Sequence, residues 1–146
     1  MMRSTMENNF YSSIRFITIL LFALYSANAA ALNNILDQIE ISESRDQSVL
    51  KIKFTEQLLY RSHAPKAKAD LVHINMLLQG SSSEITLESE FLSWKPSSTV
   101  PLFEIALEPI GPDQTDLVLR FNKQVEFDIQ GSPDSYSILI TIFHPQ

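Results

Sequence analysis

Apolar residues alternate with polar ones along most of this chain, and this period of two constrains its fold more than any other feature. The segments 48–55, 103–108 and 137–143 each carry a large apolar residue at every second position. Successive side chains of a β-strand point to opposite faces of its sheet, so such alternation predicts half-buried strands. The sequence therefore predicts an all-β fold.

The other expected strands are separated by turn residues. The three glycines lie between apolar runs, where a turn is most useful. Segment 71–79 is apolar on both parities, which predicts a central strand covered on both faces. Only 32–38 and 66–70 suit a helical turn. We expect further strands at 36–42, 85–91, 116–121 and 125–130.

Short strands with regular turn signals predict a single β-sandwich of about eight strands, with a small closed β-barrel as the alternative. The residues expected in the core share the inward parity of their strands. They are Leu50, Ile52, Phe54, Val72, Ile74, Leu119, Phe121, Phe127, Ile140 and Ile142.

Composition excludes several classes of protein. The chain has 17 acidic and 11 basic residues among 146, a net charge of −6 and no cysteine. Without cysteine there is no disulfide framework, thiolate metal site or cysteine nucleophile. The negative charge opposes binding to nucleic acid, which needs a concentrated positive field. We expect no nucleic-acid partner.

The N-terminal residues have the pattern of a secretion signal. Arg3 and Arg15 precede the uncharged run 16–25, and Ala27 and Ala29 follow it at the spacing that signal peptidase reads. A membrane-spanning helix needs ~20 apolar residues, about twice this run, so a cleaved signal is favoured over an anchor.

Cleavage after Ala29, with Ala31 as the alternative, would leave residues 30–146 as a single domain with no stable membrane span. The absence of cysteine and of Asn-x-Ser/Thr sequons favours the periplasm of a Gram-negative bacterium over a eukaryotic secretory route. We expect a periplasmic or secreted protein.

The chain also contains an internal repeat. Residues 46–60 (DQSVLKIKFTEQLLY) align without a gap on 113–127 (DQTDLVLRFNKQVEF). The identical pairs are Asp46/Asp113, Gln47/Gln114, Leu50/Leu117, Phe54/Phe121 and Gln57/Gln124. Alternation explains matching apolar positions, but it does not explain the Asp-Gln pair and the later Gln at equal spacing.

Extending the alignment defines two related halves, 36–79 and 103–143, connected by 80–102. Upstream, Ile39 matches Ile105. Downstream, one inserted residue brings Val72 onto Ile140 and Ile74 onto Ile142. We expect two meander halves that face each other, because one meander alone cannot bury its apolar face. Lys53 and Arg120 should then occupy equivalent positions, as should Phe54 and Phe121.

The repeated unit resembles the AMIN domain. The resemblance lies in segments 117–121, 125–127 and 137–142, and in 50–54, Tyr60, Pro65 and 70–74. AMIN domains are β-sandwiches found with periplasmic amidases and pilus secretins, where they are thought to bind peptidoglycan or localise proteins in the envelope. The resemblance covers nearly all of residues 30–146 and implies such a role here. It assigns no binding residue.

No catalytic residue, metal site or cofactor is predicted. The three histidines, His63, His73 and His144, lack metal-ligand spacing, and His73 is expected on a strand face. No G-x-S-x-G elbow occurs. Two carboxylate pairs are spaced as a glycosidase would need, but alternation already places them on solvated faces. They are Glu88/Glu90 and Glu126/Asp128.

Two segments are candidates for binding. Arg61, His63, Lys66 and Lys68 concentrate positive charge within eight residues of an acidic chain, which suits an anionic partner, although a solvated loop has the same pattern. Trp94 lies on a proline-bounded segment and is either a contact residue or a plug over one end of the sandwich.

These observations lead to three functional hypotheses. The first is an exported, non-catalytic envelope module that binds peptidoglycan or contacts a cell-wall or pilus machine. The second is a periplasmic carrier of a small apolar ligand held between the sheets. The third is a carboxylate-pair hydrolase.

Overall fold

A computed structural model describes residues 34–80 and 85–146, so the predicted signal segment 1–29 lies outside the described residues. The described part contains eight strands and no helix. The strands are β1 (Leu36–Glu43), β2 (Gln47–Phe54), β3 (Leu58–Ala64), β4 (Lys68–Leu78), β5 (Glu90–Ser93), β6 (Leu102–Pro109), β7 (Gln114–Gly131) and β8 (Ser137–Phe143).

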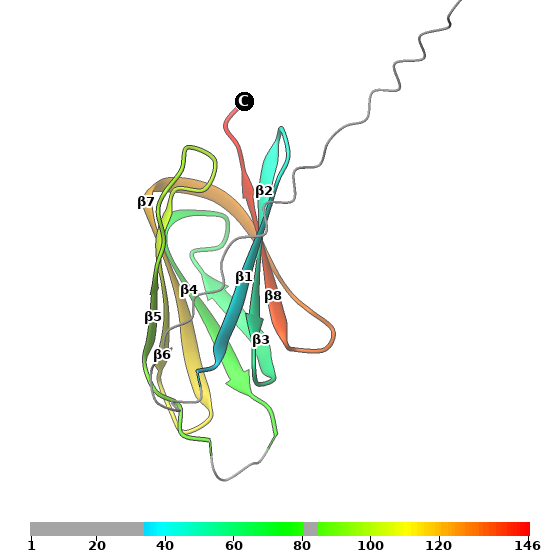
Figure 1. Cartoon of the computed structure of the whole chain (residues 1–146), viewed down its shortest axis with the longest axis vertical. Helices are drawn as coiled ribbons and strands as arrows, with labels where there is room; N and C mark the ends of the chain where they lie inside the picture. Colours follow the sequence, from blue (N-terminus) through cyan, green and yellow to red (C-terminus); the bar gives the residue numbers. More distant parts are fainter. Residues whose placement is uncertain (1–33, 81–84) are drawn as a thin grey trace, which may run out of the picture.

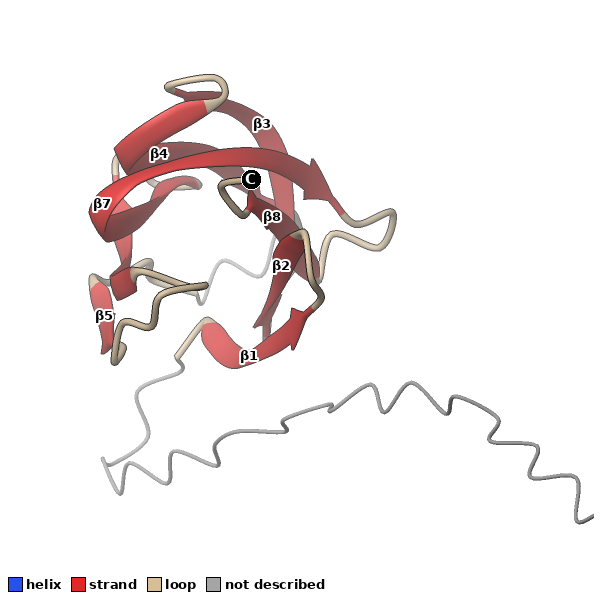
Figure 2. Ribbon diagram, turned by 90° about the horizontal axis from the view of Figure 1, so that it is seen from above, coloured by secondary structure: helices blue, strands red, loops and turns tan. Residues whose placement is uncertain are grey.

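All eight strands belong to one antiparallel sheet. The order along its main path is β1-β2-β8-β7-β4-β3, and β6 joins it by pairing with β7 on one side and β5 on the other. The sheet curls over the core so that its β1 edge and its β5 edge face each other (Figures 1 and 2). In the described residues no ladder joins β1 to β5. The fold is therefore sandwich-like and is not the closed barrel of the alternative.

The strand boundary expected between residues 121 and 125 is wrong, because β7 continues through it. Two strands, 116–121 and 125–130, were expected, whereas β7 is continuous over 18 residues. The connecting residues Asn122, Lys123 and Gln124 are all exposed and include neither glycine nor proline, so the strand bends here without ending. Figure 2 shows β7 following the curve of the sheet. The first part of β7 pairs with β6, and its last part pairs with β8.

The strand expected at 85–91 is also shorter in the structure. Only β5 forms, and residues 85–89 have no regular structure. Glu90 pairs with Leu107, so continuing the ladder would place Glu88 opposite Pro109. Proline has no N–H to donate, and the ladder ends before it.

Strand β4 is covered on one face only, which corrects the expectation for 71–79. Val72, Ile74 and Met76 have no accessible surface, whereas His73 on the opposite face is exposed. The helical turn considered for 66–70 does not form, because Lys68 begins β4. Within the described residues of 32–38, β1 begins at Leu36.

The predicted core is confirmed. All ten residues expected inside are buried, and they belong to one contiguous cluster that includes residues of both halves. Ile138 and Ile140 of β8 belong to this cluster and pair with Ile52 and Leu50 of β2.

The pairing registers of the two halves match. Ile39 pairs with Ile52 between β1 and β2, and Ile105 pairs with Leu119 between β6 and β7. The sequence alignment relates these same residues to one another. The first hairpins of the two halves are therefore equivalent residue by residue.

The fourth strand of each half pairs across to the other half. Val72 of β4 pairs with Leu119 of β7, and Ile138 of β8 pairs with Ile52 of β2. The sequence alignment relates Leu119 to Ile52, so their pairing partners Val72 and Ile138 are also equivalent. The exchange between the halves is therefore symmetrical. It holds the two halves together by backbone hydrogen bonds as well as by the core.

These registers correct the downstream part of the sequence alignment. Val72 is equivalent to Ile138 and not to Ile140, so the second half is one residue shorter here and not one longer. The cause is a register irregularity at Arg61, between Tyr60 and Ser62 in β3, that has no counterpart in the β7–β8 ladder. A β-bulge takes up one extra residue in one strand of a pair.

Other equivalences expected from the repeat agree with the structure. Phe54 and Phe121 are both buried, each with 4% of its surface exposed. Lys53 forms an ion pair with Glu40 of β1, and Arg120 forms one with Glu104 of β6. A further pair, Ser48 and Thr115, places a hydroxyl in the core at the same position of each half, and both residues are fully buried.

Candidate functional site

The predicted basic residues lie around one turn. Arg61 and His63 belong to β3, Lys66 lies in the connection, and Lys68 begins β4. We call residues 61–68 the basic turn. Arg61, Lys66 and Lys68 are exposed, whereas His63 is half-buried, because it lies beyond the bulge on the inward parity of β3 opposite Ile74.

His63 holds the turn together from inside. Its Nε2 donates to the carbonyl of Lys66 at 2.9 Å, so a neutral ring accepts the Tyr60 hydroxyl at Nδ1, at 2.6 Å. The ring also packs edge-on against Phe127, with centroids 5.8 Å apart. Both ring nitrogens are therefore engaged within the chain, and His63 positions the turn.

Tyr60 supports this arrangement electrostatically. Burial, and secondly the nearby charge of Asp128, raise the pKa of the Tyr60 phenol above its ordinary value. The phenol accordingly stays protonated and can donate to His63. The turn is held by the hydrogen bond between Tyr60 and His63 beneath its exposed cations.

The cations of the turn differ in their surroundings. Nζ of Lys68 lies 4.0 Å from the carboxylate of Glu126, its ladder partner on β7, in a pair that is mostly exposed. Within 34–80 and 85–146, Arg61 and Lys66 form no ion pair. These two residues carry the positive charge that the turn offers to a partner.

Trp94 follows β5 and packs against the core. It is half-buried, and its backbone N–H donates to the carbonyl of Phe103 at 2.7 Å. This placement agrees with the plug considered from the sequence. The structure gives no contact between Trp94 and the basic turn.

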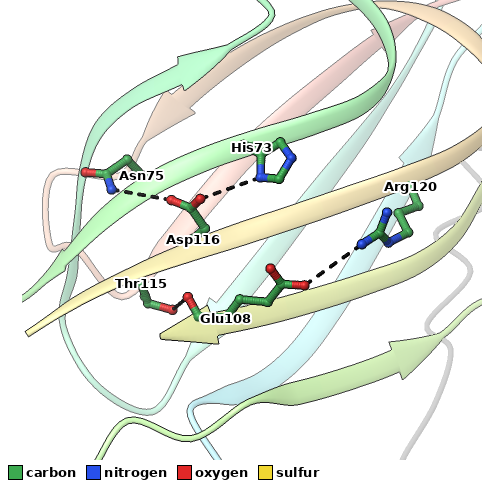
Figure 3. A network of polar contacts seen from close by, with 6 residues as sticks. All are labelled: His73, Asn75, Glu108, Thr115, Asp116 and Arg120. Carbon is green, nitrogen blue, oxygen red and sulfur yellow. Dashed lines mark hydrogen bonds and ion pairs between the residues drawn. The ribbon is translucent and has the colours of Figure 1, made fainter. Parts of the chain in front are cut away.

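A polar network covers the outer face of β4, β7 and β6 (Figure 3). Asp116 lies between Asn75 and His73: its carboxylate accepts from Asn75 at 3.4 Å and lies 3.5 Å from Nδ1 of His73. Arg120 donates to Glu104 at 2.8 Å and lies 3.9 Å from Glu108. His73 is thus a strand-face residue in an ion-paired surface, as its sequence position indicates.

Ser48 and His144 form a contact that resembles part of a catalytic triad. Nδ1 of His144 donates to the carbonyl of Arg45 at 3.2 Å, so Nε2 accepts from the Ser48 hydroxyl at 2.7 Å. Ser48 has no accessible surface, however, so a substrate does not reach its oxygen. The contact attaches the C-terminal segment to the β1–β2 turn.

The two carboxylate pairs considered from the sequence differ in their surroundings. Glu88 is exposed, while the Glu90 carboxylate accepts the backbone N–H groups of Ile35 and Leu36 at 2.6 and 2.8 Å. Glu126 and Asp128 are both exposed on the outer face of β7. Through its two hydrogen bonds, Glu90 joins β5 to the start of β1.

Among the described residues, no group of three or more His, Cys, Asp or Glu side chains has a geometry that suits a metal ion. No helix in this part of the chain is long and apolar enough to cross a membrane. No protein-family model matches the chain, and no curated protein is significantly similar to it.

Sequence reasoning missed the contacts of Ser48 and Glu90. Ser48 shares the inward parity of Leu50, Ile52 and Phe54, which was a detectable signal that its hydroxyl is buried. Glu90 gave no comparable signal, because its partners are backbone groups more than fifty residues away.

Proposed function

We propose that this protein is an exported, non-catalytic module of the bacterial envelope that binds peptidoglycan or contacts a protein of a cell-wall or pilus machine. The basic turn is its contact surface for anionic groups. The observation that carries the proposal is that Arg61 and Lys66 are exposed and have no ion-pair partner in the described residues.

Preorganisation supports this role for the turn. The contacts of His63 with Tyr60 and with the Lys66 carbonyl fix the backbone beneath the two cations. A fixed loop loses little conformational entropy on binding, which favours affinity from few contacts. A peptidoglycan strand or stem peptide offers carboxylates as suitable partners.

Charge supports a local contact. The chain carries a net charge of −6, so an anionic polymer is repelled at long range. Attraction then has to act within about one Debye length, ~8 Å at physiological salt. The basic turn provides cations at that range, although Glu126 offsets the charge of Lys68.

The resemblance of both halves to the AMIN domain adds to the proposal, because it implies the same cell compartment and kind of partner. A carrier of a small apolar ligand is the second candidate. It requires an enclosed cavity lined by aromatic side chains.

Co-sedimentation of the purified protein with purified sacculi tests the envelope module. The proposal predicts that the protein sediments with sacculi and is released by muramidase digestion. Absence of sedimentation, together with displacement of an apolar fluorescent probe from the protein by fatty acids, would favour the carrier instead.

A further inference from the structure

The basic turn is attached to strand β7. Lys68 pairs with Glu126 in the ladder between β4 and β7, and both side chains are exposed on the outer face of the sheet. One step further into the turn, the N–H of Phe127 donates to the carbonyl of Ala67 at 2.9 Å. The antiparallel alignment of the two segments therefore continues beyond the start of β4.

This alignment places Lys66 opposite Asp128 of β7. Residues that face each other across an antiparallel ladder have Cβ atoms about 5 Å apart. Burial and, secondly, the charge of Asp128 raise the pKa of Tyr60, whose hydroxyl contacts His63 beneath the turn. This effect agrees with the position that the alignment gives to Asp128. Asp128 therefore lies beside the exposed cations of the turn.

Cations and carboxylates are balanced around the turn. Its three cations are accompanied by three exposed carboxylates of β4 and β7, namely Asp70, Glu126 and Asp128. Lys68 and Glu126 lie 4.0 Å apart and offset each other. In the described residues, Arg61 and Lys66 form no ion pair, and neither does Asp128. The surface thus presents unpaired charge of both signs.

This arrangement opposes a partner that carries only one kind of charge. A purely anionic group that reaches Arg61 and Lys66 also meets the negative charge of Asp128, and like charges brought together reduce affinity. A purely cationic group is repelled by the turn itself. A peptide residue with a free carboxyl group and a free amino group complements both sides of the surface.

An exposed aromatic side chain lies in the same row of the outer face. Phe143 of β8 pairs with Glu126 on the side of β7 opposite to Lys68, and 42% of its surface is exposed. Aliphatic parts of a bound peptide can pack on this ring while its charged groups contact β7 and the turn. The surface therefore suits a peptide better than a simple anion.

We propose that the basic turn and Asp128 together bind a zwitterionic residue of the peptidoglycan peptides, with its carboxylate at Arg61 and Lys66 and its ammonium group at Asp128. Peptides that are not cross-linked offer both groups. This inference rests on the proposed function and names the chemical class that the site recognises. Recognition requires both charges of the ligand, which distinguishes it from a general attraction between an anionic polymer and basic residues.

Chemically modified sacculi test the proposal. Binding to purified sacculi is compared with binding to sacculi whose amino groups are acetylated and to sacculi whose carboxyl groups are amidated. Each modification should weaken binding of the parent protein by at least about threefold, because each removes one of the two charges. Sensitivity to only one modification, or to neither, would overturn the proposal and leave the proposed function standing. Absence of binding to unmodified sacculi would overturn both.

Two aspartate substitutions provide a matched pair. Asp128→Asn should weaken binding to unmodified sacculi by about threefold. It should bind acetylated sacculi as the parent does, which also shows that the variant is folded. If the turn recognised anions alone, the same substitution would strengthen binding, because it removes a repelling charge.

Asp113→Asn is the control. It removes an exposed carboxylate just before the start of β7, at the opposite end of this strand, and should leave binding to every preparation unchanged. Stronger or unchanged binding of Asp128→Asn to unmodified sacculi would overturn the proposal, as would equal effects of the two substitutions.

Discussion

Ile41 and Leu107 occupy equivalent positions in the two halves of the fold, yet Leu107 is fully buried and Ile41 is half-exposed. The difference arises because β5 flanks β6 and no strand flanks β1 in the described residues. The two halves thus share their hairpin registers but differ at one edge. That edge is where the molecule departs from its own symmetry.

Truncation of these two residues should have unequal effects on stability. Leu107→Ala removes a fully buried side chain and should lower the free energy of unfolding by ~3 kcal/mol. Ile41→Ala removes one that is already partly hydrated and should cost about half as much or less. Urea denaturation measures both. Equal losses would show that Ile41 is as well covered in solution as Leu107.

Gly131 is a second point at which packing constrains the sequence. A Cβ at this position would lie 2.9 Å from Cβ of Tyr60, so β3 or β7 would have to move. Gly131→Ala should destabilise the protein by ~1–3 kcal/mol through overpacking. Gly111→Ala is the control, because its Cβ would make an ordinary contact at 3.7 Å with Gln114 and should change stability by less than ~0.5 kcal/mol. Thermal unfolding distinguishes the two, and a neutral Gly131→Ala would contradict the close approach.

Glu90 should act as the contact between β5 and β1. Glu90→Gln leaves one acceptor oxygen for two backbone donors and should cost ~1 kcal/mol in the free energy of unfolding. The amides of Ile35 and Leu36 should then exchange with solvent faster. Glu88→Gln, at an exposed position two residues earlier, should change neither quantity. Unchanged exchange in Glu90→Gln would mean that other contacts hold the start of β1.

Tyr60 should make stability depend on pH in the alkaline range. Burial, and secondly the charge of Asp128, raise the pKa of Tyr60 in the folded protein, so the folded state holds this proton more tightly than the unfolded state. The resulting stability is fully present below about pH 10, the ordinary tyrosine pKa, and is lost as the pH rises through the raised value. Tyr60→Phe should remove this loss, whereas Tyr136→Phe, at an exposed position, should retain it. Denaturation at a series of pH values gives the comparison.

The sequence predicts the strands and the inward residues well, because both depend on local alternation. Leu50, Ile52 and Phe54 are buried as their parity requires. The repeat also relates Lys53 to Arg120 correctly, since both form ion pairs with the preceding strand of their half.

Features that depend on distant partners were not predictable in the same way. The pairing of Val72 with Leu119 joins two halves whose relative placement no local pattern encodes. The bulge at Arg61 shifts the repeat by one residue, but a bulge and an insertion are difficult to tell apart in sequence. Pro109 ends the β5–β6 ladder only because of the register in which Glu90 meets Leu107.

The candidate site was predictable in composition but not in detail. Arg61 and Lys66 are exposed, which agrees with a solvated basic segment. His63 reads as one more potential cation in the sequence, whereas in the structure its ring lies inward, between Tyr60 and Phe127. The bulge at Arg61 changes the parity of the residues that follow it. The alternation of apolar and polar residues in the sequence therefore does not show which way the His63 side chain points.

Affinity for purified sacculi, measured at several salt concentrations, tests the central claim most directly. The account predicts that the double variant Arg61→Ser/Lys66→Ser binds at least about tenfold more weakly than the parent and that parental binding weakens as salt rises. The control variant Arg45→Ser/Lys95→Ser removes the same charges from exposed positions elsewhere and should bind like the parent. Binding by Arg61→Ser/Lys66→Ser that equals the parent's at every salt concentration would contradict the account.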